Sequence, residues 1–374
     1  MKKTILHISK YYYPDLGGIE TIAKSMADGL KDFHNVVVCF ATDGKSSTDN
    51  IDGITVYRVN VNFSVKHQDV ALSYYHTLRS INREYAPEYV HLHCPNPYLY
   101  PIVLRVFPKT TKIVLHWHSD IISKGIIYQL IMPFERAILK RADLIVATSP
   151  NYIHPTSPIY PYREKTDVVP NGIITSDFDP RPGDEQMIAE IKARYGHKPL
   201  VLFIGRHIAY KGLDLLLEAE KHLKSDCKII IAGSGPLTEQ LKRQCHSPRI
   251  VFAGRLSNDE LRCHAYAADV FAFPSNTKAE AFGVALAEAM YCGTAPVVFH
   301  LEGSGVNWVS VKDKTGIEVP LADTKAFADG IDRLLADESL RGTLAEASRQ
   351  RVATMFTDKA AVGKMNEIYH RLNS

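Results

Sequence analysis

Short apolar runs rich in β-branched residues alternate with segments of helical periodicity along almost the whole chain. This alternation is typical of parallel, doubly wound α/β sheets, whose strands are buried on both faces. The first set of expected strands covers residues 4–9, 35–42, 54–61, 89–94, 112–118, 144–148 and 167–170. The second set covers residues 199–205, 227–233, 249–254, 269–274, 295–300 and 315–319. We therefore predict two Rossmann-like domains in series.

The two domains are expected to meet in a segment rich in Asp, Pro and Gly, residues 171–198. We predict an N-terminal domain over residues 1–175 and a C-terminal domain over residues 176–357. After the last expected strand the pattern is wholly helical. The final helix, within residues 358–374, is expected to pack back onto the first domain.

Composition restricts the class of protein without identifying it. The chain has 374 residues, 45% hydrophobic and 23% charged, which is usual for a folded globular protein in water. A formal charge of +3 without a strongly basic domain argues against nucleic-acid binding. The six cysteines show no metal-binding spacing and indicate a reducing compartment. The N-terminus predicts a strand, not a signal peptide, and no apolar run reaches the roughly 20 residues that span a membrane. We expect a cytoplasmic protein.

Charge is uneven between Tyr100 and Arg141, where seven basic residues face two acidic ones, a net charge of 7 − 2 = +5. The basic residues are Arg105, Lys109, Lys112, Lys124, Arg136, Lys140 and Arg141. They are interleaved with Tyr100, Phe107, Ile121, Ile122, Ile126, Ile127, Tyr128, Leu130 and Ile131. This mixture suits either an anionic membrane surface with shallow insertion or an ordinary core beneath a solvated face.

Glycines follow two of the expected strands. Gly17 and Gly18 lead into the first helix, whose N-terminal N–H groups favour phosphate. The pair does not match the G-x-G-x-x-G dinucleotide fingerprint, which argues against a dehydrogenase. Gly235 lies in the loop GSGPL after the strand at 227–233. Each loop alone is also compatible with an ordinary turn.

Charged residues follow two strands of the second domain. Arg206 and Lys211 come after the strand at 199–205, where parallel sheets bind ligands, and two cations can neutralise a diphosphate leaving group. Glu280 precedes a helix opened by Phe282 and Gly283, and Glu288 lies within that helix. Carboxylates so placed suit the hydroxyl groups of a sugar and a ribose. The alternatives are a solvated cation pair, a helix cap and an exposed helix acid.

In the first domain, His118 ends the expected strand at 112–118, and Asp120 follows it. Polar groups at a strand's carboxyl end suit a ligand site, although a single histidine is more often structural. His116 shares a strand face with His118, so the sequence does not tell which of the two histidines belongs to the candidate site.

In this order and spacing, the segments GGIE, HSD, GR-x4-KG, GSGP and EAFG resemble retaining glycosyltransferases of the GT-B fold, specifically glycosyltransferase family 4. The resemblance covers essentially the whole chain. HSDI, IVATSPNY, VVPNGI and EAFGVALAEAM look most like bacterial mannosyltransferases that build O-antigen and related polysaccharides from GDP-mannose. The resemblance implies two Rossmann-like domains whose parallel sheets face an interdomain cleft.

The resemblance also implies a role for each motif. Glu280 and the backbone of Phe282 and Gly283 would grip the transferred sugar, and His118 would lie beside it. Asp120 would serve acceptor binding or local structure. The implied catalytic residues are His118, Arg206, Lys211 and Glu280. The implied donor-binding residues are Gly17, Gly18, Arg206, Lys211, Gly235, Phe282, Gly283 and Glu288, the last at the ribose.

The implied reaction moves α-mannose from GDP-mannose onto a glycan carried by polyprenyl diphosphate, with retention of configuration. Because two cations would stabilise the departing β-phosphate, we expect neither a metal nor another cofactor. The acceptor would bring the enzyme to the inner face of the cytoplasmic membrane. The alternatives are a UDP-sugar-dependent transferase of the same fold (GlcNAc, glucose or galactose), a non-catalytic sugar-nucleotide-binding protein and a nucleotide-dependent epimerase.

Overall fold

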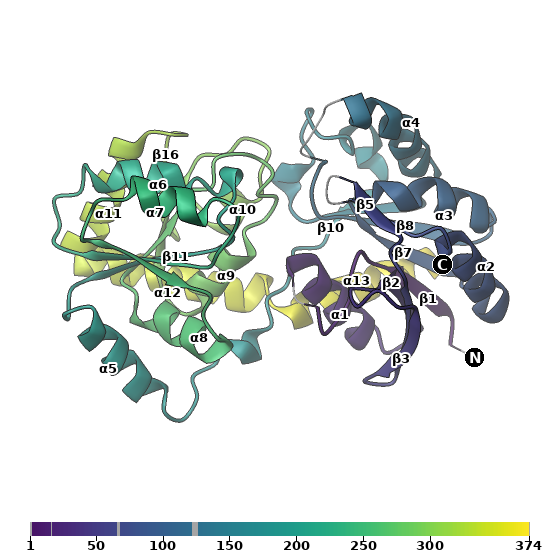
Figure 1. The fold of residues 1–374 in the computed structure, drawn as a ribbon, viewed down its shortest axis with the longest axis horizontal. Helices are drawn as coiled ribbons and strands as arrows, with labels where there is room; N and C mark the ends of the chain where they lie inside the picture. The colour runs from purple at the N-terminus through teal and green to yellow at the C-terminus, as the bar shows by residue number, and fades with distance from the viewer. Residues whose placement is uncertain (1, 16, 66–67, 122–125, 374) are drawn as a thin grey trace. The chain divides into compact units, whose positions relative to one another are not determined.

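The protein is described by a computed structural model that covers residues 2–15, 17–65, 68–121 and 126–373. The chain forms two compact units (Figure 1). Unit 1 contains residues 1–170 together with the C-terminal segment 358–374, and unit 2 contains residues 171–357. The first unit thus ends at Pro170, slightly before the expected division at residue 175.

Unit 1 is built on an eight-stranded sheet in the order β10-β9-β8-β7-β1-β2-β4-β3. The strands are β1 (Thr4–Ile8), β2 (His34–Phe40), β3 (Ser47–Ile51), β4 (Ile54–Val59), β7 (Tyr89–Cys94), β8 (Lys112–Trp117), β9 (Leu144–Ala147) and β10 (Thr166–Val168). All neighbours pair in parallel except β3, which runs antiparallel to β4 at the edge. A separate short hairpin joins β5 (Phe63–Val65) and β6 (Gln68–Val70).

The helices of unit 1 cover this sheet. They are α1 (Gly18–Gly29), α2 (Tyr74–Tyr85), α3 (Tyr100–Val106), α4 (Ile126–Arg141) and the C-terminal α13 (Asp358–Asn373). Helices α1 and α13 lie side by side (Figure 1). Met26 of α1 and Met365 of α13 are both at most 1% exposed in a core shared with β1. The C-terminal helix therefore completes the core of the first unit.

Unit 2 is built on a six-stranded, wholly parallel sheet in the order β13-β12-β11-β14-β15-β16. Its strands are β11 (Leu200–Ile204), β12 (Lys228–Ala232), β13 (Ile250–Gly254), β14 (Val270–Phe273), β15 (Ala295–Phe299) and β16 (Ile317–Val319). Its helices are α5 (Asp184–Arg194), α6 (Leu213–Glu220), α7 (Thr238–Gln244), α8 (Asn258–Ala267), α9 (Val284–Tyr291), α10 (Val306–Val309), α11 (Thr324–Ala336) and α12 (Glu338–Met355). The predicted pair of Rossmann-like domains is confirmed.

Part of the basic, apolar stretch in unit 1 belongs to the core. Tyr100 and Phe107 are 0% and 4% exposed, so the idea that their side chains reach a membrane is wrong. Leu130 and Phe134 of α4, by contrast, are 71% and 46% exposed. Ile122 and Lys124 lie outside the described residues, as do the side chains of Ile126 and Ile127. Within the described part of the chain, no helix combines the length and apolar character needed to cross a bilayer.

Candidate functional site

The strand order of each unit has one point at which the chain reverses its direction across the sheet. In unit 2 the chain runs outward from β11 through β12 to β13 and then returns to β14 on the other side of β11. In unit 1 it runs outward from β1 through β2 and β4, and returns to β7 on the other side of β1. Open α/β sheets bind ligands beyond the carboxyl ends of the strands at such switch points.

Lys211 and Glu280 meet at the switch point of unit 2. Lys211 follows β11, Glu280 follows β14, and the Nζ atom of Lys211 donates a hydrogen bond to Oε2 of Glu280. The same Oε2 accepts a hydrogen bond of 3.1 Å from the hydroxyl of Ser275, which is fully buried. Burial lowers the pKa of Lys211, but the hydrogen bond to Glu280 and the surrounding charges, that of Glu280 first, together outweigh burial and leave the pKa raised. The ammonium group therefore stays charged at this edge of the sheet.

The turn that carries Lys211 is fixed by close backbone contact. Gly212 follows the 3-10 turn Ala209–Lys211 at φ +64°, and a Cβ atom there would overlap the carbonyl oxygen of Pro274. The ammonium group lies 5.4 Å from the ring centroid of Phe273, the last residue of β14. A glycine and an aromatic ring thus hold the cation in place.

Arg206 belongs to the same loop but has no such anchor. Its side chain is exposed, and it forms no ion pair with any residue that the structure describes. An unpaired guanidinium beside a buried ammonium group leaves positive charge available to an anionic ligand. Unit 2 thus brings Lys211 and Glu280 together, and Arg206 lies in the same loop as Lys211.

Glu288 lies in the same electrostatic neighbourhood. It is partly buried in α9, and burial raises the pKa of its carboxyl group from 4.5 to about 7. The charge of Asp177 contributes to this rise in the pKa, whereas the charge of Lys211 opposes it. Burying this carboxyl group is costly, and no described residue offers it an offsetting hydrogen bond, so it suits a ligand's hydroxyl groups.

The start of α9 supplies backbone groups rather than side chains. Phe282 is 2% exposed, and its ring packs against Trp308 and Phe356 at centroid distances of 6.3 and 5.4 Å. Gly283 is the residue that precedes α9. Phe282 can therefore contribute to a ligand site only through its backbone, which is the role that the family resemblance implies.

Gly235 permits two loops to approach each other. A Cβ atom at this position would lie 2.5 Å from the carbonyl oxygen of His207. The N–H group of Gly235 donates a hydrogen bond of 2.8 Å to Oγ1 of Thr238, at the start of α7. The GSGPL loop thus supports the loop of Arg206, and this packing alone accounts for the glycine.

Asp177, Phe178 and Asp179 form an Asp-x-Asp pattern, which metal-dependent glycosyltransferases use. Phe178 is 6% exposed in the core of unit 2, and Asp179 accepts a hydrogen bond of 2.6 Å from the hydroxyl of Tyr291. Because the Asp-x-Asp pattern is present, the expectation that no metal is needed rests on Arg206 and Lys211 alone.

In unit 1, Gly17 and Gly18 stand at the beginning of α1 as expected. Gly17 precedes the helix in an extended conformation, and Gly18 is its first residue. No atom lies within 4 Å of a Cβ built on Gly18, whereas one on Gly17 would displace the flexible side chain of Glu20. Both glycines follow β1, next to the switch point of this unit.

His118 and Asp120 follow β8 and are almost completely buried, at 4% and 6% exposure. Oδ1 of Asp120 accepts hydrogen bonds from Nε1 of Trp117 at 3.0 Å and from the hydroxyl of Ser157 at 3.3 Å. The N–H group of Asp120 donates to the hydroxyl of Tyr152 at 2.7 Å. These contacts give Asp120 a structural task in shaping the loop that holds His118.

Sequence reasoning missed several polar residues at these positions. Ser275, which bonds Glu280, carries no motif of its own. His7 on β1 and His91 and His93 on β7 pack with His116 and His118 in one buried cluster. The H-x-H pattern at 91–93 was visible in the sequence, but its partners depend on strand register.

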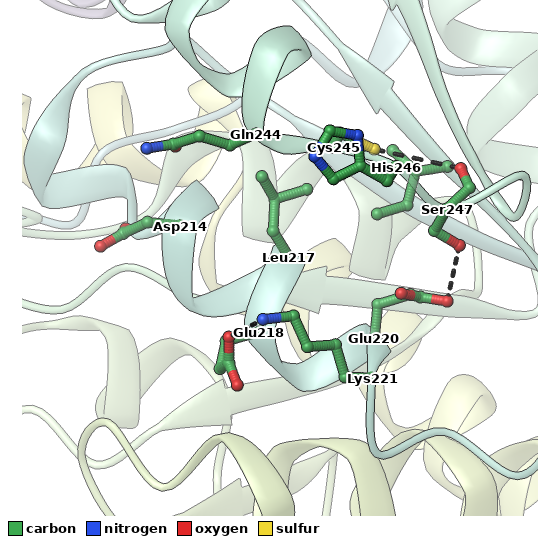
Figure 2. A pocket seen from close by; sticks show the side chains of 10 residues that line it. Asp214, Leu217, Glu218, Glu220, Lys221, Gln244, Cys245, His246 and Ser247 are labelled. Carbon is green, nitrogen blue, oxygen red and sulfur yellow. Dashed lines mark hydrogen bonds and ion pairs between the residues drawn. The ribbon is translucent and has the colours of Figure 1, made fainter.

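Two surface hollows of unit 2 lie away from these residues. One, of about 510 Å³, is lined by α6 and by residues 244–247 (Figure 2), and Ser247 there donates a hydrogen bond of 2.7 Å to Glu220. The other, of about 590 Å³, adjoins residues 180–188. None of Arg206, Lys211, Glu280 and Glu288 lines either hollow. The candidate site is therefore not a hollow. It is marked by a charged cluster, which consists of Lys211, Glu280 and Glu288 together with Arg206 in the loop of Lys211.

Two family models match successive parts of the chain. The model described as "Glycosyltransferase Family 4" matches residues 16–177, and that described as "Glycosyl transferases group 1" matches residues 184–351. The first corresponds to most of unit 1, and the second to most of unit 2.

Curated relatives match along the chain. O-antigen chain mannosyltransferase C of Escherichia coli is 27% identical over 98% of this chain and 98% of its own. The D-rhamnosyltransferase WbpZ of Pseudomonas aeruginosa is 27% identical over 94% and 92%. A GDP-mannose-dependent α-(1-6)-phosphatidylinositol monomannoside mannosyltransferase of Mycobacterium tuberculosis is 27% identical over 60% and 62%.

Solved structures share the fold. Sucrose-phosphate synthase of Thermosynechococcus elongatus superposes with a TM-score of 0.77 at 21% identity, covering 99% of both chains. Anabaena Alr3699/HepE in complex with UDP superposes with a TM-score of 0.76 at 19% identity, covering 99% of this chain and 100% of its own.

Proposed function

Because the chain belongs to the family 4 glycosyltransferases of the GT-B fold, we propose that it transfers α-mannose from GDP-mannose with retention of configuration. The proposed acceptor is a glycan on polyprenyl diphosphate, in the synthesis of O-antigen or a related polysaccharide. The E. coli relative is an O-antigen mannosyltransferase, and the M. tuberculosis relative is GDP-mannose-dependent by name.

The observation that carries the proposal is the charged cluster at the switch point of unit 2. Cleavage of the sugar–phosphate bond leaves negative charge on the β-phosphate and positive charge on the sugar ring. The ammonium group of Lys211 and the guanidinium of Arg206 are the groups that would stabilise the departing phosphate. We expect these two cations to do so without a metal ion.

The remaining residues hold the donor. Glu280, already oriented by Lys211 and Ser275, would accept hydrogen bonds from the hydroxyl groups of the sugar. Glu288 would accept them from the ribose. The acceptor hydroxyl would attack from the side of the leaving group, and the family resemblance assigns His118 a contact with the sugar.

The proposed acceptor requires contact with a membrane surface. Leu130 and Phe134 of α4 expose apolar side chains, and the exposed Lys140 and Arg136 lie on the same helix. Exposed apolar groups next to cations suit shallow insertion among anionic lipids. We propose that α4 makes this contact at the inner face of the cytoplasmic membrane.

A thermal-shift comparison of nucleotide sugars tests the donor. We expect GDP and GDP-mannose to raise the melting temperature, and Lys211→Met to abolish the shift. UDP-GlcNAc, UDP-glucose and UDP-galactose should have no comparable effect. A clear shift with a UDP-sugar and none with GDP or GDP-mannose would end the mannosyl proposal in favour of a UDP-sugar-dependent transferase.

A further inference from the structure

Apolar side chains face outward on the hairpin of β5 and β6 in unit 1. Ser64 and Asp69 are register partners across the hairpin, and the buried Asp69 accepts hydrogen bonds from the hydroxyl groups of Ser64 and Tyr11. The polar side of the hairpin is therefore turned toward the loop after β1. Because neighbouring residues of a strand point to opposite sides, Phe63 and Val65 point away from that loop, and they are 52% and 47% exposed. This is the reverse of the usual order, in which the apolar side is covered.

Leu72 adds a third exposed apolar side chain at the start of α2. It is 68% exposed, and its N–H group donates a hydrogen bond of 2.8 Å to Oδ1 of Asn62, the residue before β5. The hydroxyl of Tyr98, which lies just before α3, donates a hydrogen bond of 2.8 Å to the carbonyl oxygen of the residue before Leu72. Phe63, Val65 and Leu72, which we call the apolar edge, thus lie where α2 and α3 begin.

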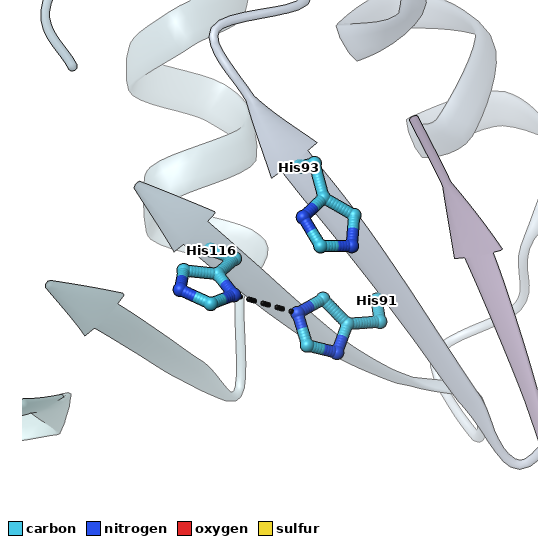
Figure 3. A group of neighbouring side chains, drawn as sticks. All are labelled: His91, His93 and His116. Carbon is cyan, nitrogen blue, oxygen red and sulfur yellow. Dashed lines mark hydrogen bonds between the residues drawn. The ribbon is translucent and has the colours of Figure 1, made fainter. Parts of the chain in front are cut away.

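Helices α2, α3 and α4 form one layer on a single face of the sheet. Helix α2 packs against α3, and α3 packs against α4. The ring of Tyr74 in α2 lies 4.9 Å from that of Phe40 in β2, whereas the adjacent Cys39 belongs to a core shared with α1. Neighbouring residues of a strand point to opposite faces, so α2 and α1 cover opposite faces. Helix α13 packs beside α1, and its Tyr369 lies 2.8 Å from Nδ1 of His91, one of the three histidines drawn in Figure 3.

The two helical layers differ in charge. Helices α2, α3 and α4 carry six basic residues and two acidic ones, namely Arg79, Arg83, Arg105, Arg136, Lys140 and Arg141 against Glu84 and Glu135. Glu135 is 2% exposed, so Glu84 is the one exposed acid among the described residues of these helices. Helices α1 and α13 carry four basic and four acidic residues, namely Lys24, Lys359, Lys364 and Arg371 against Glu20, Asp28, Asp358 and Glu367. The layer of α2, α3 and α4 therefore attracts an anionic surface, and the opposite layer does not.

We propose that unit 1 docks on an anionic lipid bilayer through the layer of α2, α3 and α4, with the apolar edge inserted among the acyl chains. Exposed apolar side chains beside basic ones suit shallow insertion, and each Arg or Lys near such a surface adds to the attraction. A second copy of this chain is disfavoured as the occupant, because it would place two basic layers against each other. The inference rests on the proposed membrane contact of α4 and extends it to α2 and the hairpin. It does not depend on the identity of the donor.

Tryptophan fluorescence of the full chain tests the insertion directly. Phe63→Trp should shift its emission to shorter wavelength with phosphatidylglycerol vesicles and should be quenched by lipids brominated on the acyl chain. The matched Leu321→Trp, at a position that is 51% exposed in unit 2, should show neither effect. The parent chain, measured alongside, accounts for the emission of the native tryptophans. A response at both positions, or at neither, would overturn the insertion of the apolar edge.

Co-sedimentation with the same vesicles tests the layer. We expect about 10-fold weaker binding by Phe63→Ser combined with Leu72→Ser, because two apolar side chains no longer leave water. Arg79→Gln combined with Arg83→Gln should also weaken binding about 10-fold. The matched controls are Leu321→Ser and the pair Lys359→Gln and Lys364→Gln on exposed positions of α13, and they should bind like the parent. Parent-like binding by both test variants, or equal losses in the controls, would overturn the proposal.

Further arms separate the possible failures. If only Arg136→Glu with Lys140→Glu weakens binding, the contact of α4 stands and the extension to α2 and the hairpin is overturned. The vesicles contain no polyprenyl lipid, so binding that requires added polyprenyl diphosphate would overturn docking on the bilayer in favour of the lipid substrate. A dimer in analytical ultracentrifugation that Phe63→Ser dissociates would overturn it in favour of a second copy. The thermal shift with GDP-mannose, measured without vesicles, should be equal in the parent and all these variants, so a failure of the donor proposal is seen there alone.

Discussion

Glu288→Gln should stabilise the unliganded protein at alkaline pH while weakening nucleotide binding. The carboxyl group of Glu288 has its pKa raised from 4.5 to about 7, first by burial and then by the charge of Asp177. The folded chain therefore binds a proton more readily than the unfolded chain does. Stability contributed by this group is present below pH 4.5 and is lost as the pH rises toward 7.

The size of the effect follows from the shift. A rise from 4.5 to about 7 corresponds to about 3 kcal/mol above pH 7, at 1.36 kcal/mol per pKa unit. The side chain is only partly buried, so screening by water reduces this to about 2 kcal/mol. Glutamine has similar shape and no charge. We expect Glu288→Gln to be about 2 kcal/mol more stable than the parent at pH 8 and nearly equal to it at pH 5.

Urea unfolding followed by tryptophan fluorescence measures the difference. The chain has two tryptophans, and Trp308 packs against Phe282 and Phe356 in unit 2. In a Trp117→Phe background, Trp308 reports the unfolding of the unit that contains Glu288. A partner measurement of GDP affinity at pH 8 should show weaker binding by Glu288→Gln, because a charge-assisted hydrogen bond to ribose is lost.

The same pH dependence of stability in Glu288→Gln and its parent would refute the reasoning about the carboxyl group. A stabilised variant with unchanged GDP affinity would show that Glu288 is strained without serving the nucleotide. Our reasoning requires both results: the Glu288→Gln protein is more stable than its parent, and it binds GDP more weakly. Together they show a residue whose charge destabilises the fold but serves nucleotide binding.

Further predictions concern catalysis, packing, metals and membranes. Lys211→Met should lower kcat on the order of 10²-fold in steady-state assays, and an unchanged kcat would exclude a role for Lys211 in stabilising the leaving group. Gly235→Ala should lower the melting temperature, because its Cβ would lie 2.5 Å from a backbone carbonyl, whereas Gly342→Ala in α12, with open space around it, should be neutral or stabilising. Activity should persist in EDTA, and strict dependence on Mn²⁺ would contradict the two-cation mechanism. The double change Arg136→Glu and Lys140→Glu in α4 should weaken binding to phosphatidylglycerol vesicles, and undiminished binding would refute the proposed membrane contact.

The strands of both sheets could be predicted because most are buried on two faces and therefore read as continuous apolar runs. The antiparallel edge strand β3 could not, since its sequence STDNI has one apolar residue and its side chains alternate between exposed and half-buried. The hairpin of β5 and β6 was missed because each strand has only three residues, and those of β5 are exposed. Strands of this kind are held by pairing, which the sequence of one segment does not reveal.

The candidate site was predictable as far as it depends on strand ends. Residues that follow neighbouring parallel strands must meet at one edge, which brought Lys211 and Glu280 together correctly. Their direct ion pair and the part played by Ser275 depend on side-chain packing. The neighbours of His118 could not be predicted, because they depend on the register of β7 against β8. The burial of Tyr100 and Phe107 could not be predicted either. An apolar residue between basic residues gives the same sequence pattern in a protein core and at a membrane surface.

The central claim is that this chain transfers mannose with retention from a nucleotide donor bound by Arg206, Lys211 and two glutamates. The most direct test incubates the protein with GDP-mannose and a polyprenyl-diphosphate-linked glycan and determines the anomeric configuration of the product by NMR. The account predicts an α-mannosyl product that Lys211→Met does not form. A β-linked product, or transfer from a UDP-sugar in place of GDP-mannose, would contradict it.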